Sequence, residues 1–262
     1  MKHLFSHLKE VFSRIEKKPV FLFLDFDGTL APLAPTPQEA FLPANIYNLI
    51  KRLAALPMVR LAIISGREMN DLKRKVGIEG IIYSGNHGLE CDYPEAAFGT
   101  KIDPLMLKRL SDAGRKLRQK LSAFPGVVFE DKTYSLSVHY RNVPVAQRGM
   151  LKQMVESVLE PYVKARQFVL EQGKMVVEVR LDMDWHKGKI ARSLMDRFPG
   201  STPIYIGDDR TDEDAFAVVR PQGLAVFVGD HNKDSQAEYF LNDTLEVQKF
   251  LEFIDNHFRQ DR

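Results

Sequence analysis

The sequence lacks most of the features that direct a protein to an oxidising compartment, a membrane or nucleic acid. It has a single cysteine, Cys91, so no disulfide can form within this chain, which agrees with a reducing compartment. No apolar run is long enough to span a bilayer. Lys and Arg total 37 against 35 Asp and Glu, so no large charge excess is present to attract a polyanion. We therefore expect a cytoplasmic protein that binds neither nucleic acid nor a membrane.

Apolar residues are nevertheless plentiful, at 44% of 262 residues, which is enough for a sizeable core in one large domain or two modest ones. Between residues 4 and 15 they recur at helical spacing among charged residues. This pattern predicts an amphipathic helix packed on the body of the protein. A helix that lies on a membrane surface is the alternative.

Apolar strands alternate with helices over much of the chain. Residues 20–24 form a nearly continuous apolar run that ends in the polar stretch 25–29, as a strand buried on both faces does. The same alternation predicts further elements: helices at 44–56, 187–198 and 212–219, and strands at 59–64, 80–83, 203–206 and 224–228. Such a chain is typical of the α/β class with a mostly parallel, Rossmann-like sheet, whose ligands bind beyond the carboxyl ends of the strands.

The pattern changes in the middle of the chain. Residues 102–124 predict a long amphipathic helix, residues 127–141 alternate as a hairpin does, and a second helix begins at Pro144. A second hairpin follows, with its turn near Gln172 and Gly173. Two helices against one antiparallel sheet make an α+β insert, which we expect to act as a lid. We therefore predict two domains: a core of residues 1–93 and 183–262, and an inserted cap of residues 94–182.

The strongest chemical signal is the motif DFDGT at residues 25–29, directly after the first buried strand. Two carboxylates two residues apart at a kinked strand end can be aimed at one point, with Asp25 as nucleophile and Asp27 as general acid and base. A polar turn is the alternative, because Asp and Gly are common turn formers. Ser65 at the next strand end can hold a phosphoryl oxygen, and Lys187 at a helix start can neutralise charge during transfer.

Five carboxylates fall within residues 207–214, after a predicted strand. Without a cation they would repel one another. Mg²⁺ prefers oxygen ligands and takes few protein carboxylates besides phosphate and water, so we expect Asp25, Asp208 and the carbonyl of Asp27 to bind it. A helix N-terminus enriched in acidic residues is the alternative, and it explains Asp208 poorly.

The order of Asp25, Asp27, Ser65, Lys187 and Asp208 resembles the motifs of the haloacid-dehalogenase-type phosphatases. Within that superfamily the chain is similar to the trehalose-6-phosphate phosphatases. Five stretches carry the similarity: residues 24–33 (LDFDGTLAPL), 64–67 (ISGR), 85–90 (GNHGLE), 130–141 (EDKTYSLSVHYR) and 207–213 (GDDRTDE). The resemblance implies a Mg²⁺-dependent hydrolysis of trehalose 6-phosphate to trehalose and phosphate through an aspartyl-phosphate, with a cap that closes over the disaccharide.

The resemblance also implies roles for further residues. Thr29 would help to place Asp27, while Asp209 and Asp212 would orient the metal ligands or hold Lys187. The substrate contacts that it implies come from two core loops and a cap hairpin: Arg67, Asn86, His87, Glu130, Lys132 and Arg141. Lys174 and Glu178 lie on the charged face of the alternating residues 174–181, and we expect this face to look toward the active site and to contact substrate. For His87 a loop-structuring role is the alternative, and for the cap residues a solvated polar sheet face.

Two other functions stay open. Phosphatases of sucrose, glucosylglycerol or mannosylglycerate phosphate share the core chemistry and differ in cap residues. A domain that has lost activity would be a sugar-phosphate-binding regulatory module, although retention of the motif residues argues against it. We expect a monomer whose partner is a small-molecule sugar phosphate, with a trehalose-phosphate synthase of the same pathway as the candidate protein partner.

Overall fold

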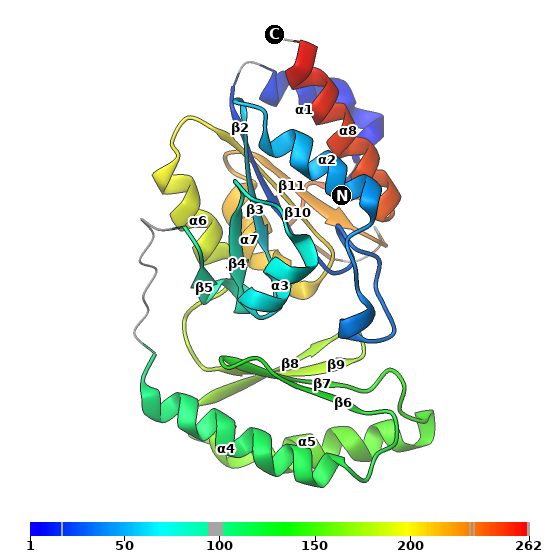
Figure 1. Ribbon diagram of the computed structural model, residues 1–262, viewed down its shortest axis with the longest axis vertical. Helices are drawn as coiled ribbons and strands as arrows, with labels where there is room; N and C mark the ends of the chain where they lie inside the picture. The colour runs from blue at the N-terminus through cyan, green and yellow to red at the C-terminus, as the bar shows by residue number, and fades with distance from the viewer. Residues whose placement is uncertain (17, 94–101, 231, 233, 261–262) are drawn as a thin grey trace. The chain divides into compact units, whose positions relative to one another are not determined.

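The computed structural model describes residues 1–16, 18–93, 102–230, 232 and 234–260 (Figure 1). The chain divides into two compact units. The first takes Met1–Ala34, Ala40–Ala97 and Trp185–Arg262, and the second takes Pro35–Glu39 and Phe98–Asp184. The predicted junction after residue 93 borders residues 94–101, which lie outside the described residues. The short stretch Pro35–Glu39, which the sequence pattern assigns to the core, groups with the second unit.

The first unit is built around a mostly parallel sheet. Its described strands are β1 (Lys2–His3), β2 (Val20–Leu24), β3 (Val59–Ile64), β4 (Ile82–Gly85), β5 (Glu90–Cys91), β10 (Thr202–Gly207), β11 (Leu224–Val228) and β12 (Tyr239–Leu241). They lie in the order β1-β12-β11-β10-β2-β3-β4-β5, and each neighbouring pair is parallel except β4 with β5. The predicted α/β class with a mostly parallel sheet is confirmed.

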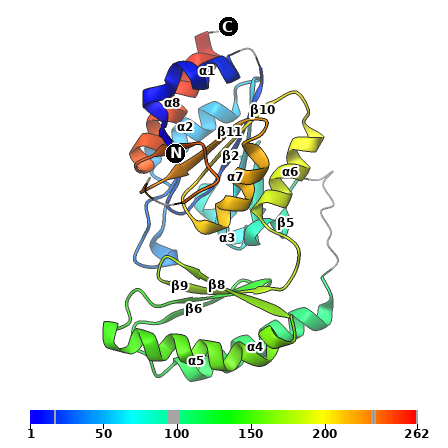
Figure 2. The same ribbon diagram turned by 180° about the vertical axis from the view of Figure 1, so that it is seen from behind.

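Helices cover both faces of this sheet. The described helices of the first unit are η1 (Leu4–His7), α1 (Leu8–Ile15), α2 (Ala44–Ala54), α3 (Met69–Val76), η3 (Asn86–Gly88), α6 (Lys187–Arg197), η4 (Arg210–Asp212), α7 (Glu213–Val219) and α8 (Thr244–Gln260). Figure 1 shows α1, α2 and α8 together on one face, and Figure 2 shows α6 and α7 on the other. Among the described residues, no helix is long and apolar enough to cross a membrane.

Strand β2 shows why its sequence is almost wholly apolar. It lies between β10 and β3, and all five of its residues are buried. Leu22 and Leu24 belong to the core cluster formed with α1, α2 and α8. Phe23, on the opposite face, stacks on Tyr205 of β10 with ring centroids 6.4 Å apart. Two covered faces leave β2 no solvated side, so the apolar run does not alternate.

The strand order creates a switch point between β2 and β10. From β2 the chain proceeds outward to β3 and β4, whereas from β10 it proceeds in the opposite direction to β11 and β12. The connections that leave the ends of these two neighbouring strands therefore diverge. In open α/β sheets such a point is where ligands bind, because it leaves a crevice at the carboxyl ends of the strands.

The second unit is an α+β fold with its own core. Its described elements are η2 (Pro37–Glu39), α4 (Pro104–Leu121), β6 (Val128–Asp131), β7 (Ser135–His139), α5 (Val145–Lys164), β8 (Phe168–Gly173) and β9 (Val176–Leu181). The strands form an antiparallel sheet in the order β6-β7-β9-β8. Helices α4 and α5 lie along one face, as Figure 2 shows, and alternate residues of β9 pack under them in one cluster. The second hairpin turns at residues 174–175, later than predicted, because Gly173 still pairs with Val176.

Candidate active site

Asp25 and Lys187 meet at the switch point. Asp25 follows β2, and its backbone N–H donates to the carbonyl of Ile206 in β10 at 2.9 Å. Lys187 is the first residue of α6, and its Nζ donates to Asp25 Oδ1 at 2.6 Å and to Asp212 Oδ1 at 2.8 Å. All three side chains are buried. The predicted nucleophile, Asp25, thus lies beside Lys187, the cation that we expect to neutralise charge during phosphoryl transfer.

Asp212 holds this arrangement together with both of its carboxylate oxygens. Its Oδ1 also accepts from the hydroxyl of Tyr205 at 2.8 Å. Its Oδ2 accepts from the backbone N–H groups of Asp208 and Asp209, each at 3.1 Å. The carboxylate of Asp209 in turn caps the short helix η4. Asp212 therefore joins Lys187 to the turn after β10, which agrees with its predicted role of holding Lys187.

Three buried carboxylates converge at this point. Asp25, Asp208 and Asp212 each offer an oxygen, and the three oxygens lie within 4.8 Å of one another. Gly28 makes room for Asp208, because a Cβ on this glycine would overlap the Asp208 carboxylate, and its φ of +85° is left-handed. Two of the three predicted metal ligands, Asp25 and Asp208, belong to this cluster.

The charges in the cluster are not independent. Burial raises the pKa of Asp25 well above its usual value, and although Lys187 opposes this, Asp212 and Asp208 reinforce it. Burial lowers the pKa of Lys187, but the carboxylates of Asp212 and Asp25 outweigh it and raise that pKa. Lys187 contacts Asp25 and Asp212, and the carboxylate of Asp208 adds further negative charge that a hard cation would offset. The buried, all-oxygen donor set fits Mg²⁺.

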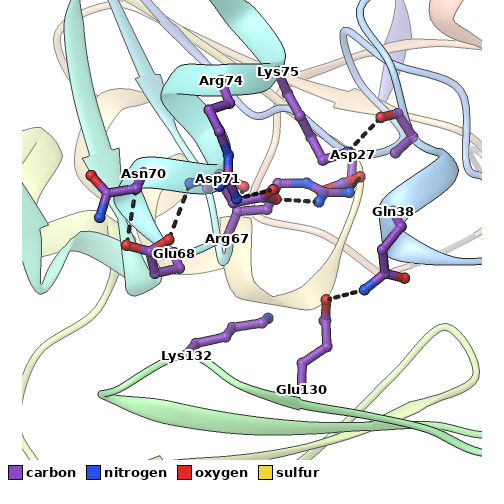
Figure 3. Close-up of polar contacts among 12 residues, drawn as sticks. Asp27, Gln38, Arg67, Glu68, Asn70, Asp71, Arg74, Lys75, Glu130 and Lys132 are labelled. Atoms are coloured by element: carbon purple, nitrogen blue, oxygen red, sulfur yellow. Dashed lines mark hydrogen bonds and ion pairs between the residues drawn. The ribbon is translucent and has the colours of Figure 1, made fainter.

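Asp27 is held by an arginine. The guanidinium of Arg67 donates from Nε to Asp27 Oδ2 and from Nη2 to Asp27 Oδ1, both at 2.7 Å, and from Nη1 to Asp71 Oδ2 at 2.8 Å (Figure 3). Arg67 is buried, whereas Asp27 is one-third exposed. The hydroxyl of Thr29 is buried without a hydrogen-bond partner among the described residues, so its predicted role in placing Asp27 stays a prediction without a contact to support it.

The loop that follows β3 and the loop that follows β4 carry the other predicted site residues of the first unit. The N–H of Asn86 donates to the carbonyl of Arg67 at 2.7 Å, and the N–H of His87 donates to the carbonyl of Ser65 at 3.0 Å. Asn86 and His87 both have a left-handed φ, at 48° and 56°, which is uncommon for residues with a side chain. A Cβ on Gly66 would collide with the ring of His87, so the loops pack closely. His87 therefore has the loop-structuring contacts that its alternative interpretation requires.

The predicted cap residues fall into two groups. Glu130 of β6, Ser137 of β7 and Glu178 of β9 lie in one cross-strand row on the face of the sheet opposite the helices. Lys132 donates to Glu178 at 3.3 Å, as does the Ser137 hydroxyl at 3.2 Å. Arg141 lies elsewhere, where its Nη2 donates to the carbonyl of Lys174 at 3.5 Å.

Several residues of these networks are absent from the predicted set. Glu130 contacts Nε2 of His139 at 2.8 Å. It also accepts from the side chain of Gln38 at 3.4 Å, as Figure 3 shows. Glu90 accepts from the side chain of Asn86 at 2.7 Å. His139 and Glu90 lie inside stretches 130–141 and 85–90, which carry the family resemblance, so the sequence offered a reason to include both among the candidate residues. Asp71 lies in the first turn of α3, four residues after Arg67, which itself precedes the helix and its capping residue Glu68.

Known proteins resemble the chain over almost its whole length. The model of the family described as Trehalose-phosphatase matches residues 23–245. The chain belongs to the trehalose-phosphatase family. Trehalose-phosphate phosphatase of Mycobacterium tuberculosis is 34% identical over 248 residues, 91% of this chain. Trehalose-phosphate phosphatase B of Arabidopsis thaliana is 33% identical over 259 residues, 93% of this chain and 68% of that protein.

Solved structures of the family share the fold. The C-terminal domain of the Candida albicans trehalose-6-phosphate phosphatase aligns with a TM-score of 0.79 at 23% identity, over 95% of this chain and 96% of that one. A trehalose-6-phosphate phosphatase related protein aligns with a TM-score of 0.74 at 25% identity, over 92% of this chain and 100% of that one. The match spans 62% of the length of the mycobacterial relatives. Family members can thus carry sequence beyond the part that this chain matches.

Proposed function

We propose that this chain hydrolyses trehalose 6-phosphate to trehalose and phosphate through an aspartyl-phosphate on Asp25. The observation that carries the proposal is the contact of the Lys187 ammonium with Asp25 Oδ1 at 2.6 Å, at the switch point and beside Asp208. Membership of the trehalose-phosphatase family and the names of its relatives support the choice of substrate.

The chain's own residues account for both chemical steps. In the first, an oxygen of Asp25 bonds to phosphorus, the bond from phosphorus to the sugar oxygen breaks, and Asp27 gives its proton to that oxygen. In the second, water bonds to phosphorus, Asp27 takes a proton from this water, and the bond from Asp25 to phosphorus breaks to release phosphate. Lys187 and the Ser65 hydroxyl stabilise the charge on the transferred group.

The cation belongs to the same proposal. Asp25 and Asp208, with the carbonyl of Asp27, would hold Mg²⁺, and Asp212 would keep Lys187 and the turn after β10 in place. Bound there, Mg²⁺ supplies Lewis-acid charge stabilisation to the phosphoryl oxygens. Asp209 supports the same turn from its capping position.

The cap residues are proposed to bind the disaccharide. Glu130, Lys132 and Glu178 supply carboxylate and ammonium groups on the polar face of the cap sheet, which suit sugar hydroxyls. Arg141, Lys174, Arg67, Asn86 and His87 complete the predicted substrate contacts. Cap closure, the monomeric state, the cytoplasmic location and a synthase partner stay predictions.

A substrate panel tests the proposal. Phosphate release is measured with Mg²⁺ on trehalose 6-phosphate, glucose 6-phosphate and sucrose 6-phosphate. We expect turnover of trehalose 6-phosphate to exceed the others by at least about tenfold in kcat/KM, because a site built for a second sugar ring leaves polar groups unpaired without it. Comparable turnover of glucose 6-phosphate would contradict the trehalose assignment, and faster turnover of sucrose 6-phosphate would reassign the substrate.

The variant Asp25→Asn tests the proposed nucleophile. Asp25→Asn keeps the shape of the side chain and removes the charged oxygen, so we expect phosphate release to fall by roughly 10³-fold or more. The matched control is Asp112→Asn, which changes an exposed carboxylate of α4 that contacts Arg115. Undiminished turnover in Asp25→Asn would exclude the proposed nucleophile. Binding of sugar phosphates without turnover in the unmodified chain would favour a regulatory module.

A further inference from the structure

The contact between Asp27 and Arg67 has a geometry that fixes orientation. Two N–H groups of one guanidinium meet the two oxygens of one carboxylate, both at 2.7 Å. Such a two-point pair fixes the position of the carboxylate and also the rotation of its plane, which a single contact leaves free. Asp27 lies in the turn that follows β2, two residues after the proposed nucleophile, and is one-third exposed. Both of its oxygens therefore face the Arg67 guanidinium. A carboxylate has about four lone pairs, so this contact also sets the directions of the two lone pairs that it does not use.

Arg67 is in turn held from its far side. Its third donating nitrogen, Nη1, meets Asp71 Oδ2 at 2.8 Å, and in Figure 3 the guanidinium lies between Asp27 and Asp71. The side chain of Arg67 is buried, with its guanidinium carbon 5.3 Å from the centroid of the Phe26 ring. At least three of its five N–H groups are thus committed to carboxylates of this chain.

Asp71 is a suitable anchor because its own position is rigid. It lies in the first turn of α3, where its N–H donates to the capping carboxylate of Glu68 at 3.1 Å. The loop before α3 is tied down as well, since the carbonyl of Arg67 accepts from the N–H of Asn86 and the N–H of Met69 donates to Glu90. A functional group on a helix keeps a fixed orientation when further hydrogen bonds support the residue that contacts it.

We propose that Asp71, acting through Arg67, is a positioning residue: it fixes the plane of the Asp27 carboxylate so that the lone pairs not used by Arg67 exchange a proton with the leaving sugar oxygen and then with the attacking water. This inference rests on the proposed function, because it assumes that Asp27 is the general acid and base. It gives Arg67 a role different from the direct substrate contact that the sequence predicts. It gives Asp71 a role without any contact to substrate.

Steady-state kinetics of Asp71→Asn on trehalose 6-phosphate, with Mg²⁺, form the first test. The variant removes the charge that holds Nη1, so we expect kcat to fall by about tenfold through misaimed proton transfer, with KM within about twofold of the unmodified chain. Asp112→Asn, which loosens an exposed arginine contact on another helix, should change neither constant. A rise in KM at constant kcat would show a substrate-binding role instead and overturn the proposal, and so would unchanged kinetics.

A double-mutant cycle is the second test, because it separates positioning from general damage. If Asp71 acts through Asp27, then Asp71→Asn should change single-turnover phosphate release less than about twofold in an Asp27→Asn background. Equal losses in both backgrounds would overturn the proposal. Arg67→Lys keeps the positive charge but cannot make the two-point contact with Asp27. It should also lower kcat at nearly constant KM and have little effect in the Asp27→Asn background. This variant replaces Asp71→Asn as the test if Asp71→Asn does not fold. Failure of the proposed function is distinct: the unmodified chain would then release no phosphate.

Discussion

At the scale of single residues, Lys187 illustrates what a buried charge costs and what keeps it in place. Its side chain is 3% exposed, and its ammonium contacts two carboxylates that are themselves buried. Removing one partner of a buried ion pair leaves the others desolvated without compensation, which destabilises a fold far more than losing a surface pair. A residue proposed for catalysis is therefore also expected to stabilise the structure.

We predict that Lys187→Met lowers the free energy of unfolding by about 3 kcal/mol at neutral pH, because Asp25 and Asp212 lose their shared cation. Urea denaturation followed by circular dichroism measures this, in EDTA so that no divalent cation offsets the loss. Arg115→Met, which changes an exposed cation on α4, is the control and should leave the midpoint unchanged. Equal midpoints for the two variants would contradict the prediction.

At the scale of elements, the two long helices of the second unit, α4 and α5, each contain a glycine, and the two glycines differ in environment. Gly149 of α5 is exposed, and a Cβ there would meet nothing within 4 Å. Gly114 of α4 faces the sheet, where a Cβ would lie 3.2 Å from Leu136 Cδ2 and 3.5 Å from Phe129 Cζ. Glycine in a helix interior lowers stability because its backbone loses more conformational entropy on folding than that of other residues. Substitution by alanine regains this stability only where the added Cβ meets no neighbouring atom.

We therefore predict that Gly149→Ala raises the free energy of unfolding by about 0.5–1 kcal/mol, while Gly114→Ala gains less or destabilises. In Gly114→Ala the helix gain is offset by crowding against β6 and β7 in a close-packed interior. Thermal or urea denaturation of the two variants side by side measures the difference. Equal gains would show that α4 and its sheet adapt without cost.

The elements also differ in how well local patterns predicted them. The bounds of β3 and β11 agree with the prediction, because long apolar runs between polar turns identify strands buried on both faces. The predicted N-terminal helix is present as η1 and α1, with Val11 and Ile15 in the core. The short strands β5 and β12 were missed, since two or three residues carry no periodicity. Helix α8 was also missed.

At the scale of the whole molecule, each of the two units has apolar core residues of its own. In the first unit a cluster lies between the parallel sheet and helices α1, α2 and α8, and in the second unit a cluster lies between the antiparallel sheet and helices α4 and α5. Units with their own cores can unfold in separate transitions. The proposed cation belongs to the first unit, because Asp25, Asp208 and Asp212 all lie there.

A ligand that binds only the folded state stabilises it by mass action. We predict that saturating Mg²⁺ raises the melting temperature of the first unit by a few degrees, corresponding to about 2–3 kcal/mol at roughly 100 times the dissociation constant. Differential scanning calorimetry measures it, and EDTA should reverse it. Asp208→Asn should abolish the shift while Asp112→Asn keeps it, and an equal shift of both units would argue against a site among these carboxylates.

The sequence by itself determined the α/β class, the alternation of strands and helices, and the candidate residues for acid, base and phosphoryl-binding chemistry. These properties are local, because apolar periodicity and polar strand ends are written in neighbouring residues. Only the tertiary structure decided which side chains meet. Strand order brings Asp25 and Asp208 together, and the course of the loop before α3 aims Arg67 at Asp27. Such contacts depend on how distant segments pack, which no local pattern contains.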